Sequence, residues 1–230
     1  MAVAIFMEIF MKKLVLFLLS AALVSCFAGF SALNVKADGY SLKDELWIDS
    51  DKVQLALIGD TQKAVEYYPE TVKESMRWLV EQKSALNLKY LISMGDIVDD
   101  VDKELDSRAD PDKQLTDARA AYDILADGNV PFVLTLGNHD YEDMAFSDRI
   151  SDKFNEVFPL SVYDGFTEFG GAYGDTVENT YHFFENGNQK YMILSLGHNP
   201  TDEMLAWANR IVSENSDRKV IVVVHAYING

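Results

Sequence analysis

The apolar positions of the chain gather in five short runs from residue 53 onward. The runs cover residues 53–58, 90–94, 132–136, 191–196 and 220–224. They are rich in leucine or β-branched residues and lack strict alternation, which is typical of strands buried on both faces. The pattern therefore predicts five buried strands.

Helical periodicity fills much of the sequence between these runs. Residues 69–86 begin with Pro69, which suits a first helical turn because its missing N–H would have no partner there. Residues 201–213 begin with Thr201, a good N-cap, followed by two acidic residues that favour a helix N-terminus. A third helix is predicted at 114–126. The apolar positions with helical spacing in these segments are Val72, Met76, Leu79, Val80, Ala118, Ala121, Tyr122, Leu125, Leu205, Ala208, Ile211 and Val212.

Strands that alternate with helices indicate an α/β domain whose helices cover the faces of the sheet structure. Residues 140–188 interrupt the alternation because they are rich in Phe, Tyr, Gly and Asn. Within them, residues 180–184 followed by E-N-G-N at 185–188 predict a hairpin. The aromatic residues between 158 and 173 are expected to cover a small core of their own, with a wall of a substrate pocket as the alternative.

Composition and charge narrow the class of protein. The chain of 230 residues is 48% hydrophobic, which excludes a disordered or fibrous protein. Its 37 acidic residues outnumber 20 basic ones, for a net charge of −17. Phosphate contacts with nucleic acid need Lys and Arg, so we expect no nucleic-acid binding through a basic face. An anionic substrate stays compatible with this charge if metal ions supply the positive charge.

The N-terminus predicts export, and therefore an extracellular or cell-envelope location. Lys12 and Lys13 precede an apolar stretch over residues 14–24, as in a secretory signal peptide. Cleavage after Ala37 would give a signal peptide of residues 1–37 and a secreted domain of residues 38–230. Alternatively, L-V-S-C at 23–26 resembles a bacterial lipobox, in which Cys26, the single cysteine, carries a lipid. An uncleaved membrane anchor over residues 14–35 is the third alternative.

Polar residues that can bind a metal ion follow four of the five predicted strands. G-D-T-Q follows the first at 59–62, G-D-I-V-D-D the second at 95–100, G-N-H-D the third at 137–140, and His225 the last. In α/β domains ligands bind at the carboxyl ends of strands, so these groups are expected to converge. Carboxylate, amide and imidazole groups suit Mg, Mn, Fe or Zn. Two such ions about 3.5–4 Å apart can share one carboxylate and activate a water molecule.

These motifs resemble those of the calcineurin-like metallophosphoesterases. The family pattern is D-x-H, then G-D-x-x-D, then G-N-H-D/E, then a lone H, and finally G-H-x-H. The order matches from about residue 53 through His225. The resemblance implies an α/β fold, a two-sheet sandwich flanked by helices, with two divalent metal ions (Mn, Fe, Zn or Mg) at the strand ends.

The resemblance also implies a role for each matching residue. Asp60 would bind the first metal and Asp96 would bridge both, while Asn138 and His225 would bind the second. His139 would protonate the leaving oxygen or stabilise the transition state. The catalytic pair would be completed by Asp140, which is expected to hold the His139 ring.

Two departures from the family pattern affect these expectations. Gln62 stands where the pattern has His. A carboxamide is a weaker metal ligand than an imidazole. Gln62 is therefore expected either to bind the first metal less tightly or to hydrogen-bond a metal-bound water. D-T-Q versions of the motif resemble a branch of the same superfamily, so we treat Gln62 as a variation. The sequence ends at Gly230 without a G-H-x-H. The domain at 38–230 is therefore expected to lack its C-terminal part, and the activity of the chain as given is in question.

Other candidate residues are interpreted as structural. Asp99 and Asp100 begin an acidic run that is expected to be a solvated loop. Asp99 also fits the second Asp of the family pattern, where a structural role is expected. His182 lies within a predicted strand and is expected to be a surface or core residue. His198 follows the fourth strand, where a substitute for a missing metal ligand is the alternative, but it matches no ligand position of the family.

The sequence thus predicts an exported metal-dependent phosphoesterase that acts on a small phosphomonoester or phosphodiester, in short a phosphatase. A pyrophosphate or nucleotide hydrolase on the same site is the alternative at the level of the enzyme. A non-catalytic binding module that retains the fold is the alternative of a different class.

Overall fold

The computed structural model of the chain describes residues 52–102, 109–142 and 149–226. The predicted leader at residues 1–37, with Cys26 and the alternative anchor, lies outside the described residues. Among the helices of the described part, none has both the length and the apolar character needed to cross a membrane.

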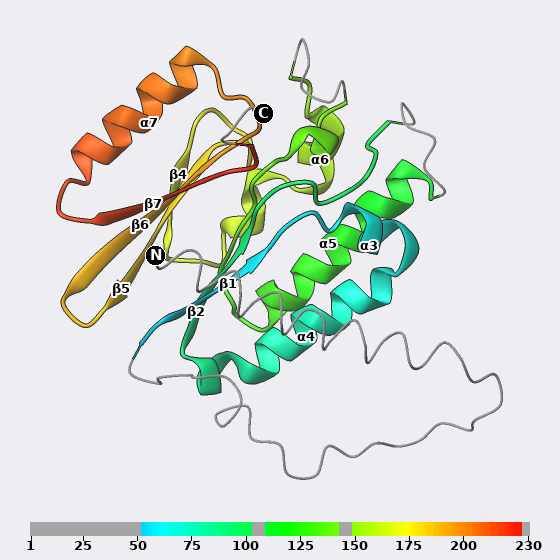
Figure 1. Ribbon diagram of the computed structural model, residues 1–230, viewed down its shortest axis with the longest axis horizontal. Helices are drawn as coiled ribbons and strands as arrows, with labels where there is room; N and C mark the ends of the chain where they lie inside the picture. Colours follow the sequence, from blue (N-terminus) through cyan, green and yellow to red (C-terminus); the bar gives the residue numbers. More distant parts are fainter. Residues whose placement is uncertain (1–51, 103–108, 143–148, 227–230) are drawn as a thin grey trace, which may run out of the picture. The chain divides into compact units, whose positions relative to one another are not determined.

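Two sheets form the centre of the fold (Figure 1). The first has the parallel order β1-β2-β3, and the second has the order β4-β5-β6-β7, in which only the β6–β7 pair is parallel. The strands are β1 (Gln54–Ile58), β2 (Leu88–Ser93), β3 (Phe132–Val133), β4 (Phe169–Ala172), β5 (Thr180–Asn186), β6 (Gln189–Leu196) and β7 (Lys219–Val224). The helices are α3 (Gln62–Tyr67), α4 (Pro69–Leu86), α5 (Pro111–Asp127), α6 (Asp152–Val157) and α7 (Asp202–Glu214), with two 3₁₀ turns, η1 (Asn138–Asp140) and η2 (Leu160–Tyr163).

The two sheets pack face to face, and helices cover their outer faces. Alternate residues of a strand point to opposite faces. One face of each sheet meets the other in a core cluster to which Tyr90, Ile92, Val133, Phe184, Ile193 and Val223 contribute. The opposite face of β2, with Leu91, packs against the cluster that contains α4 and α5. Met192 and Leu194 of β6 pack against Trp207 of α7. This four-layer arrangement, visible in Figure 1, confirms the predicted two-sheet α/β sandwich.

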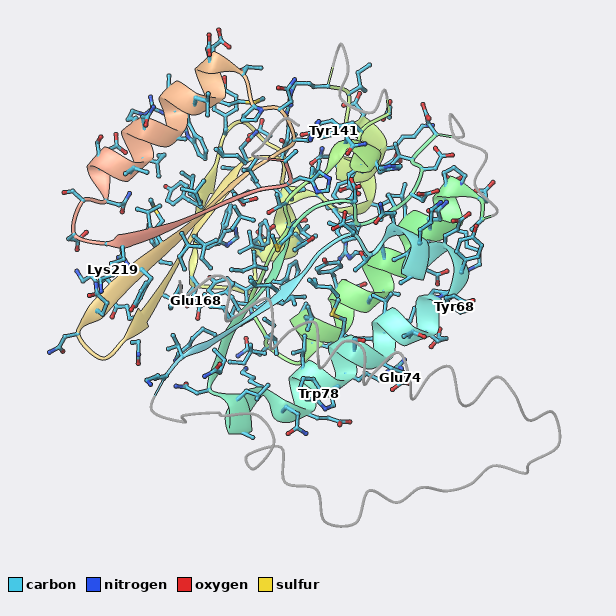
Figure 2. All side chains as sticks on the ribbon, viewed as in Figure 1. Tyr68, Glu74, Trp78, Tyr141, Glu168 and Lys219 are labelled. Atoms are coloured by element: carbon cyan, nitrogen blue, oxygen red, sulfur yellow. The ribbon has the colours of Figure 1, made fainter. Side chains whose placement is uncertain are left out.

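The helix boundaries follow from the signals in the sequence. Pro69 opens α4, and Asn87 ends it in the left-handed conformation at φ 48°, where its N–H bonds the Lys83 and Ser84 carbonyls. Thr201 caps α7 by accepting a hydrogen bond from the Met204 N–H. The outer face of α4 is polar or aromatic, with Glu74 and Trp78 labelled in Figure 2. Helix α5 begins at Pro111, three residues before the predicted start, because Asp110 caps it.

The region around residues 149–180 joins the main core instead of forming its own. Phe154, Phe158 and Tyr163 are fully buried and belong to the cluster that α4 and α5 cover. The Tyr163 hydroxyl oxygen also accepts a hydrogen bond from the Leu134 N–H, directly after β3, at 3.1 Å. The expectation of a separate small core is therefore wrong. The aromatic residues instead fix the backbone just after β3.

The edge strands β1 and β7 border an apolar groove of about 660 Å³. Leu57 and Val222 line it and are more than half exposed, at 58% and 57%. The groove also includes Met94, whose carbonyl oxygen contacts His225. Figure 2 labels Lys219 at the amino end of β7 and Tyr141 near the other end of the strands, where the polar strand ends meet.

His182 is the most deeply buried of the described histidines. Its ring lies edge-on to Tyr163 at 4.8 Å between centroids, and its Nε2 contacts the Thr180 hydroxyl at 3.0 Å. Burial lowers the pKa of His182 to about 3. The expectation of a structural histidine agrees with this position.

We expect acid to destabilise the protein through His182. The folded state keeps the ring neutral, whereas the unfolded chain binds a proton below its pKa of about 6.5, so stability falls as the pH drops from about 6.5 towards 3. Between pH 7.5 and pH 5, His182 should lower the free energy of unfolding by about 2 kcal/mol, because each pH unit below the unfolded pKa contributes about 1.4 kcal/mol. Urea unfolding of His182→Phe should show a smaller loss between these two pH values than the parent chain.

The control is the range from pH 7.5 to 8.5, where His182 is neutral in both states. There the parent and His182→Phe should have parallel stability curves. Equal losses of stability in both chains between pH 7.5 and 5 would contradict a buried neutral His182.

Candidate metal centre

Three strands bring metal-binding groups together at their carboxyl ends. Asp60 follows β1, Asp96 follows β2 and His225 follows β7, and one ligand atom from each lies within 4.8 Å of the others. The three residues are up to 165 positions apart in the chain, from 60 to 225. Their convergence is a product of the fold, as expected for the strand ends of an α/β domain.

Unusual backbone geometry lets the strand ends approach one another. Asp60 and Asp96 both have left-handed backbones, at φ 55° and 50°. A Cβ on Gly95 would lie 2.5 Å from His225 Nδ1, and one on Gly137 would lie 2.1 Å from Asp96 Oδ1. Any side chain at either glycine would therefore push the candidate ligands apart.

Asp96 is the hub of the site. Its Oδ2 accepts a hydrogen bond from Gln62 Nε2 at 3.1 Å and lies 3.4 Å from His225 Nε2, while its Oδ1 accepts from the His139 N–H at 3.1 Å. Burial by itself would raise the pKa of Asp96, but the interactions with His225 and His139 outweigh it and the net pKa is lowered. The carboxylate is thus held ionised and surrounded by donors.

His225 is oriented by contacts at both ring nitrogens. Nδ1 lies 2.9 Å from the Met94 carbonyl oxygen, which can only accept, so Nδ1 carries the proton. This leaves Nε2 directed at Asp96. The hydrogen bond to Asp96 raises the pKa of His225 to about 9. Metal-binding histidines commonly donate one ring N–H to a backbone carbonyl and bind the ion through the other nitrogen, so the contact of Nδ1 with Met94 leaves Nε2 as the candidate ligand atom.

Gln62 has one occupied and one free end. Its Nε2 is bonded to Asp96, whereas its Oε1 is buried without a hydrogen-bond partner among the described residues. An orphaned buried carbonyl costs about 1–3 kcal/mol. The free atom is also the one with which an amide binds a cation.

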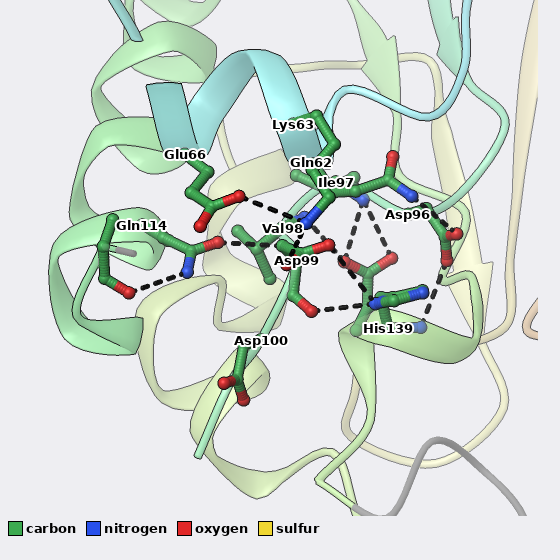
Figure 3. Close-up of polar contacts among 12 residues, drawn as sticks. Gln62, Lys63, Glu66, Asp96, Ile97, Val98, Asp99, Asp100, Gln114 and His139 are labelled. Carbon is green, nitrogen blue, oxygen red and sulfur yellow. Dashed lines mark hydrogen bonds and ion pairs between the residues drawn. The ribbon is translucent and has the colours of Figure 1, made fainter. Parts of the chain in front are cut away.

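Asn138 and His139 lie in η1, and the backbone of His139 contacts Asp96 (Figure 3). Gly137, the preceding residue, lies next to the Asp96 side chain. The His139 N–H donates a hydrogen bond to Asp96 Oδ1. The His139 ring is directed elsewhere, with Nδ1 2.8 Å from the Asp99 carbonyl oxygen and 3.7 Å from Asp99 Oδ1. His139 Nε2 is then the atom available to a substrate.

The contacts of Asp140 differ from the expectation that it holds the His139 ring. Its carboxylate, fully buried, accepts hydrogen bonds from the N–H groups of Ile97, Val98 and Gly137 at 2.8–3.2 Å. Burial raises the pKa of Asp140 to about 7. Asp140 therefore ties the loop after β2 to the loop after β3, and Asp99 is the residue that contacts the ring.

The expectation that Asp99 and Asp100 are solvated is wrong, since both are 3% exposed. Asp99 accepts from Lys63 Nζ at 2.6 Å, and its N–H donates to Gln114 Oε1 at 2.9 Å (Figure 3). Glu66 accepts from the same lysine. The match of Asp99 to the second Asp of the family pattern indicated a structural role, but its place at the start of an acidic run favoured solvent exposure. Its spacing of three residues after Asp96 was the available signal.

The sequence profile of the calcineurin-like phosphoesterases matches residues 53–230 of this chain. The chain belongs to the calcineurin-like phosphoesterase family. The match spans every strand that supplies a candidate ligand, and the mixed α/β sandwich agrees with membership in this family.

The chain is also similar to a curated protein of Bacillus subtilis (strain 168), the uncharacterized protein YvnB. The two are 29% identical over 213 residues, which cover 92% of this chain. They cover only 15% of YvnB, so this chain corresponds to a small part of that longer protein. The similarity to YvnB covers more residues than the profile match, but the name of YvnB indicates no substrate.

The donor set fits the divalent metal ions that calcineurin-like phosphoesterases typically bind. Two carboxylates and an imidazole converge, and a free amide oxygen lies beside them. These are oxygen and nitrogen ligands, which suit Mg, Mn, Fe or Zn. Asp60, Asp96 and His225 are thus the residues that could hold a metal. The individual roles of Gln62, Asn138, His139 and Asp140 stay predictions.

Proposed function

We propose that this chain is a phosphoesterase that hydrolyses phosphomonoester or phosphodiester bonds with two divalent ions at its strand ends. The observation that carries the proposal is the convergence of Asp60, Asp96 and His225 within 4.8 Å in a chain of the calcineurin-like family. The alternative, a binding module that has lost turnover, predicts the same fold but no hydrolysis.

The side chains divide into two groups around Asp96. Asp60 and Gln62 lie on the β1 side and would hold the first ion, with Asp96 shared between both. Asn138 and His225 would hold the second. When bound, the ions would offset the charge on the phosphoryl oxygens and activate the attacking water.

We propose that His139 serves the leaving group. Its Nδ1 is occupied by the Asp99 carbonyl oxygen, so the ring cannot rotate without losing that hydrogen bond. Nε2 is left to donate a proton to the departing oxygen, as a general acid does. Lys63 and Gln114 hold Asp99 in turn, so the orientation of His139 depends on α3 and α5 as well as on the strand ends.

The acidic charge of the chain is compatible with an anionic substrate only if cations are present at the site. We therefore also propose that the partner is a small phosphate ester. We propose no binding of nucleic acid through a basic face. Export, by secretion or through a lipid on Cys26, stays a proposal based on residues 1–37.

The test is metal content together with hydrolysis on the purified 230-residue chain. We expect two ions per chain by elemental analysis after incubation with Mn²⁺. We also expect hydrolysis of a chromogenic bis-phosphodiester or of the matching monoester, which EDTA abolishes and Mn²⁺ restores. Comparison of the two substrates assigns the chain as a diesterase or a monoesterase.

Two results would contradict the proposal. Two bound ions without hydrolysis of either substrate would support the binding module. No stoichiometric metal would show that the strand-end cluster is retained without its chemistry.

A further inference from the structure

His198 lies beside the candidate metal centre although it matches no ligand position of the family pattern. It follows β6, which contributes no other candidate ligand. Its ring lies 5.8 Å from the His225 ring, between centroids, at an interplanar angle of 61°. A fourth strand end therefore reaches the site that β1, β2 and β7 form.

The backbone of His198 is held in place by contacts on both sides. Its N–H donates to the Leu136 carbonyl at 2.9 Å, two residues before Asn138. Its carbonyl accepts from Arg149 Nη1, which also donates to the Asn199 carbonyl at 2.6 Å. The backbone N–H of Gly197, the preceding residue, is bonded to Asn179 Oδ1 at 3.2 Å.

The Arg149 side chain is partly buried and tied to its surroundings. It forms an ion pair with Glu178, and its Nη2 donates to the Tyr141 hydroxyl at 2.8 Å. Tyr141 directly follows η1. The loop that carries His198 is thus locked to the loop that carries Asn138 and His139, so the two loops form one rigid wall of the site.

The His198 ring, in contrast to its backbone, has a free nitrogen. Nδ1 is buried without a hydrogen-bond partner among the described residues. Buried polar atoms in native proteins are almost always paired, and an unpaired one costs about 1–3 kcal/mol. A rigid backbone that holds an unsatisfied imidazole next to His225 is the arrangement expected of a ligand-binding group.

The metal centre can use another ligand. Asp60, Asp96 and His225 offer three ligand atoms within 4.8 Å, whereas zinc takes four ligands and larger ions take more. With metal–nitrogen bonds of about 2.1 Å, two imidazoles on one ion have ring centres roughly 5 Å apart. The observed separation of the two ring centroids, 5.8 Å, is close to that distance.

We propose that His198 is a further ligand of the metal ion that His225 binds. The proposal rests on the proposed function, because it requires that the centre binds metal. The ligand it assigns is an imidazole from the β6 end, a strand end for which the sequence pattern predicted none.

The test is ¹⁵N NMR of the histidine rings during a Zn²⁺ titration of the 230-residue chain. The chain has four histidines, and loss of one signal in His198→Asn assigns its ring. We expect the His198 and His225 ring signals to move together as Zn²⁺ binds. The affinity for one Zn²⁺, measured by calorimetry, should fall at least about tenfold in His198→Asn.

Asn199→Gly is the matched control. Asn199 is exposed and has a left-handed backbone at φ 51°, which glycine adopts without strain. This variant changes the same loop but leaves the His198 ring intact, so its Zn²⁺ affinity should equal that of the parent. Equal losses in both variants would assign the effect to the loop and overturn the proposal.

The other outcomes are separable. A His225 signal that moves while the His198 signal stays, with unchanged affinity in His198→Asn, overturns the proposal and leaves the metal centre intact. The absence of any Zn²⁺ binding in the parent overturns the proposed function itself. If His198→Asn alters only KM for the substrate, His198 contacts substrate and is not a metal ligand.

Discussion

Asp96→Asn is expected to remove metal binding and turnover together. Asp96 is the one carboxylate that Gln62, His139 and His225 all contact, at 3.1–3.4 Å. Substitution by asparagine keeps the size of the side chain and tolerates the left-handed backbone at φ 50°, but it removes the negative charge and one acceptor. Since an ion contributes several kcal/mol to the stabilisation of the transition state, the rate should fall at least about 10³-fold.

The measurement is metal content by elemental analysis, together with the hydrolysis rate at saturating Mn²⁺. Asp164→Asn provides the same change of charge at an exposed position in the turn after η2, and it should retain both metal and rate. Thermal unfolding of the metal-free proteins checks that Asp96→Asn is folded. An Asp96→Asn variant that keeps two ions would show that the carboxylate is not the bridge between them.

Much of the scaffold of the site was predictable because its signals are local. The helix at 69–86 has the predicted bounds, since both its proline start and its asparagine end act within a few residues. The β7 strand was predicted to within one residue from its apolar run alone. The convergence of Asp60, Asp96 and His225 followed from the rule that strand ends in α/β domains share one edge.

The parts that could not be predicted depend on partners distant in sequence. The apolar run at 132–136 forms only two residues of strand, because the Leu134 backbone bonds the Tyr163 hydroxyl and the Ser195 side chain instead of a neighbouring strand. Asp99 is buried because Lys63 and Gln114 pair with it. An acidic run gives no indication of such partners, so composition alone favours solvent exposure.

Asp99 and Asp140 also show why adjacency in sequence misleads. Asp140 is next to His139 in the chain, yet in a 3₁₀ turn successive side chains point in different directions. Its carboxylate consequently binds the backbone of the β2 loop, and the residue that contacts the ring comes from 40 positions earlier, at Asp99. The site is built across loops and not within one motif.

His139→Ala is expected to lower the rate by about 10²–10⁴-fold while metal content stays unchanged. Only the backbone N–H of His139 contacts Asp96, and alanine retains that hydrogen bond. The ring contacts Asp99, which is not a candidate ligand. The substitution therefore removes the proposed proton donor without removing any group from around the ions.

The dependence on the leaving group separates proton donation from a general structural effect. A nitrophenolate leaves without a proton, so the hydrolysis rate of its ester should fall little in His139→Ala. An alkyl ester has a basic leaving oxygen that needs a proton, so its hydrolysis rate should show the full decrease. The measurement is kcat for both esters in the parent and in the variant, at saturating Mn²⁺. Equal losses for the two esters would assign His139 to charge stabilisation at the phosphoryl group. His139→Ala keeps the backbone N–H that bonds Asp96. A loss of metal comparable to that in Asp96→Asn would therefore mean that the His139 ring itself holds the ions.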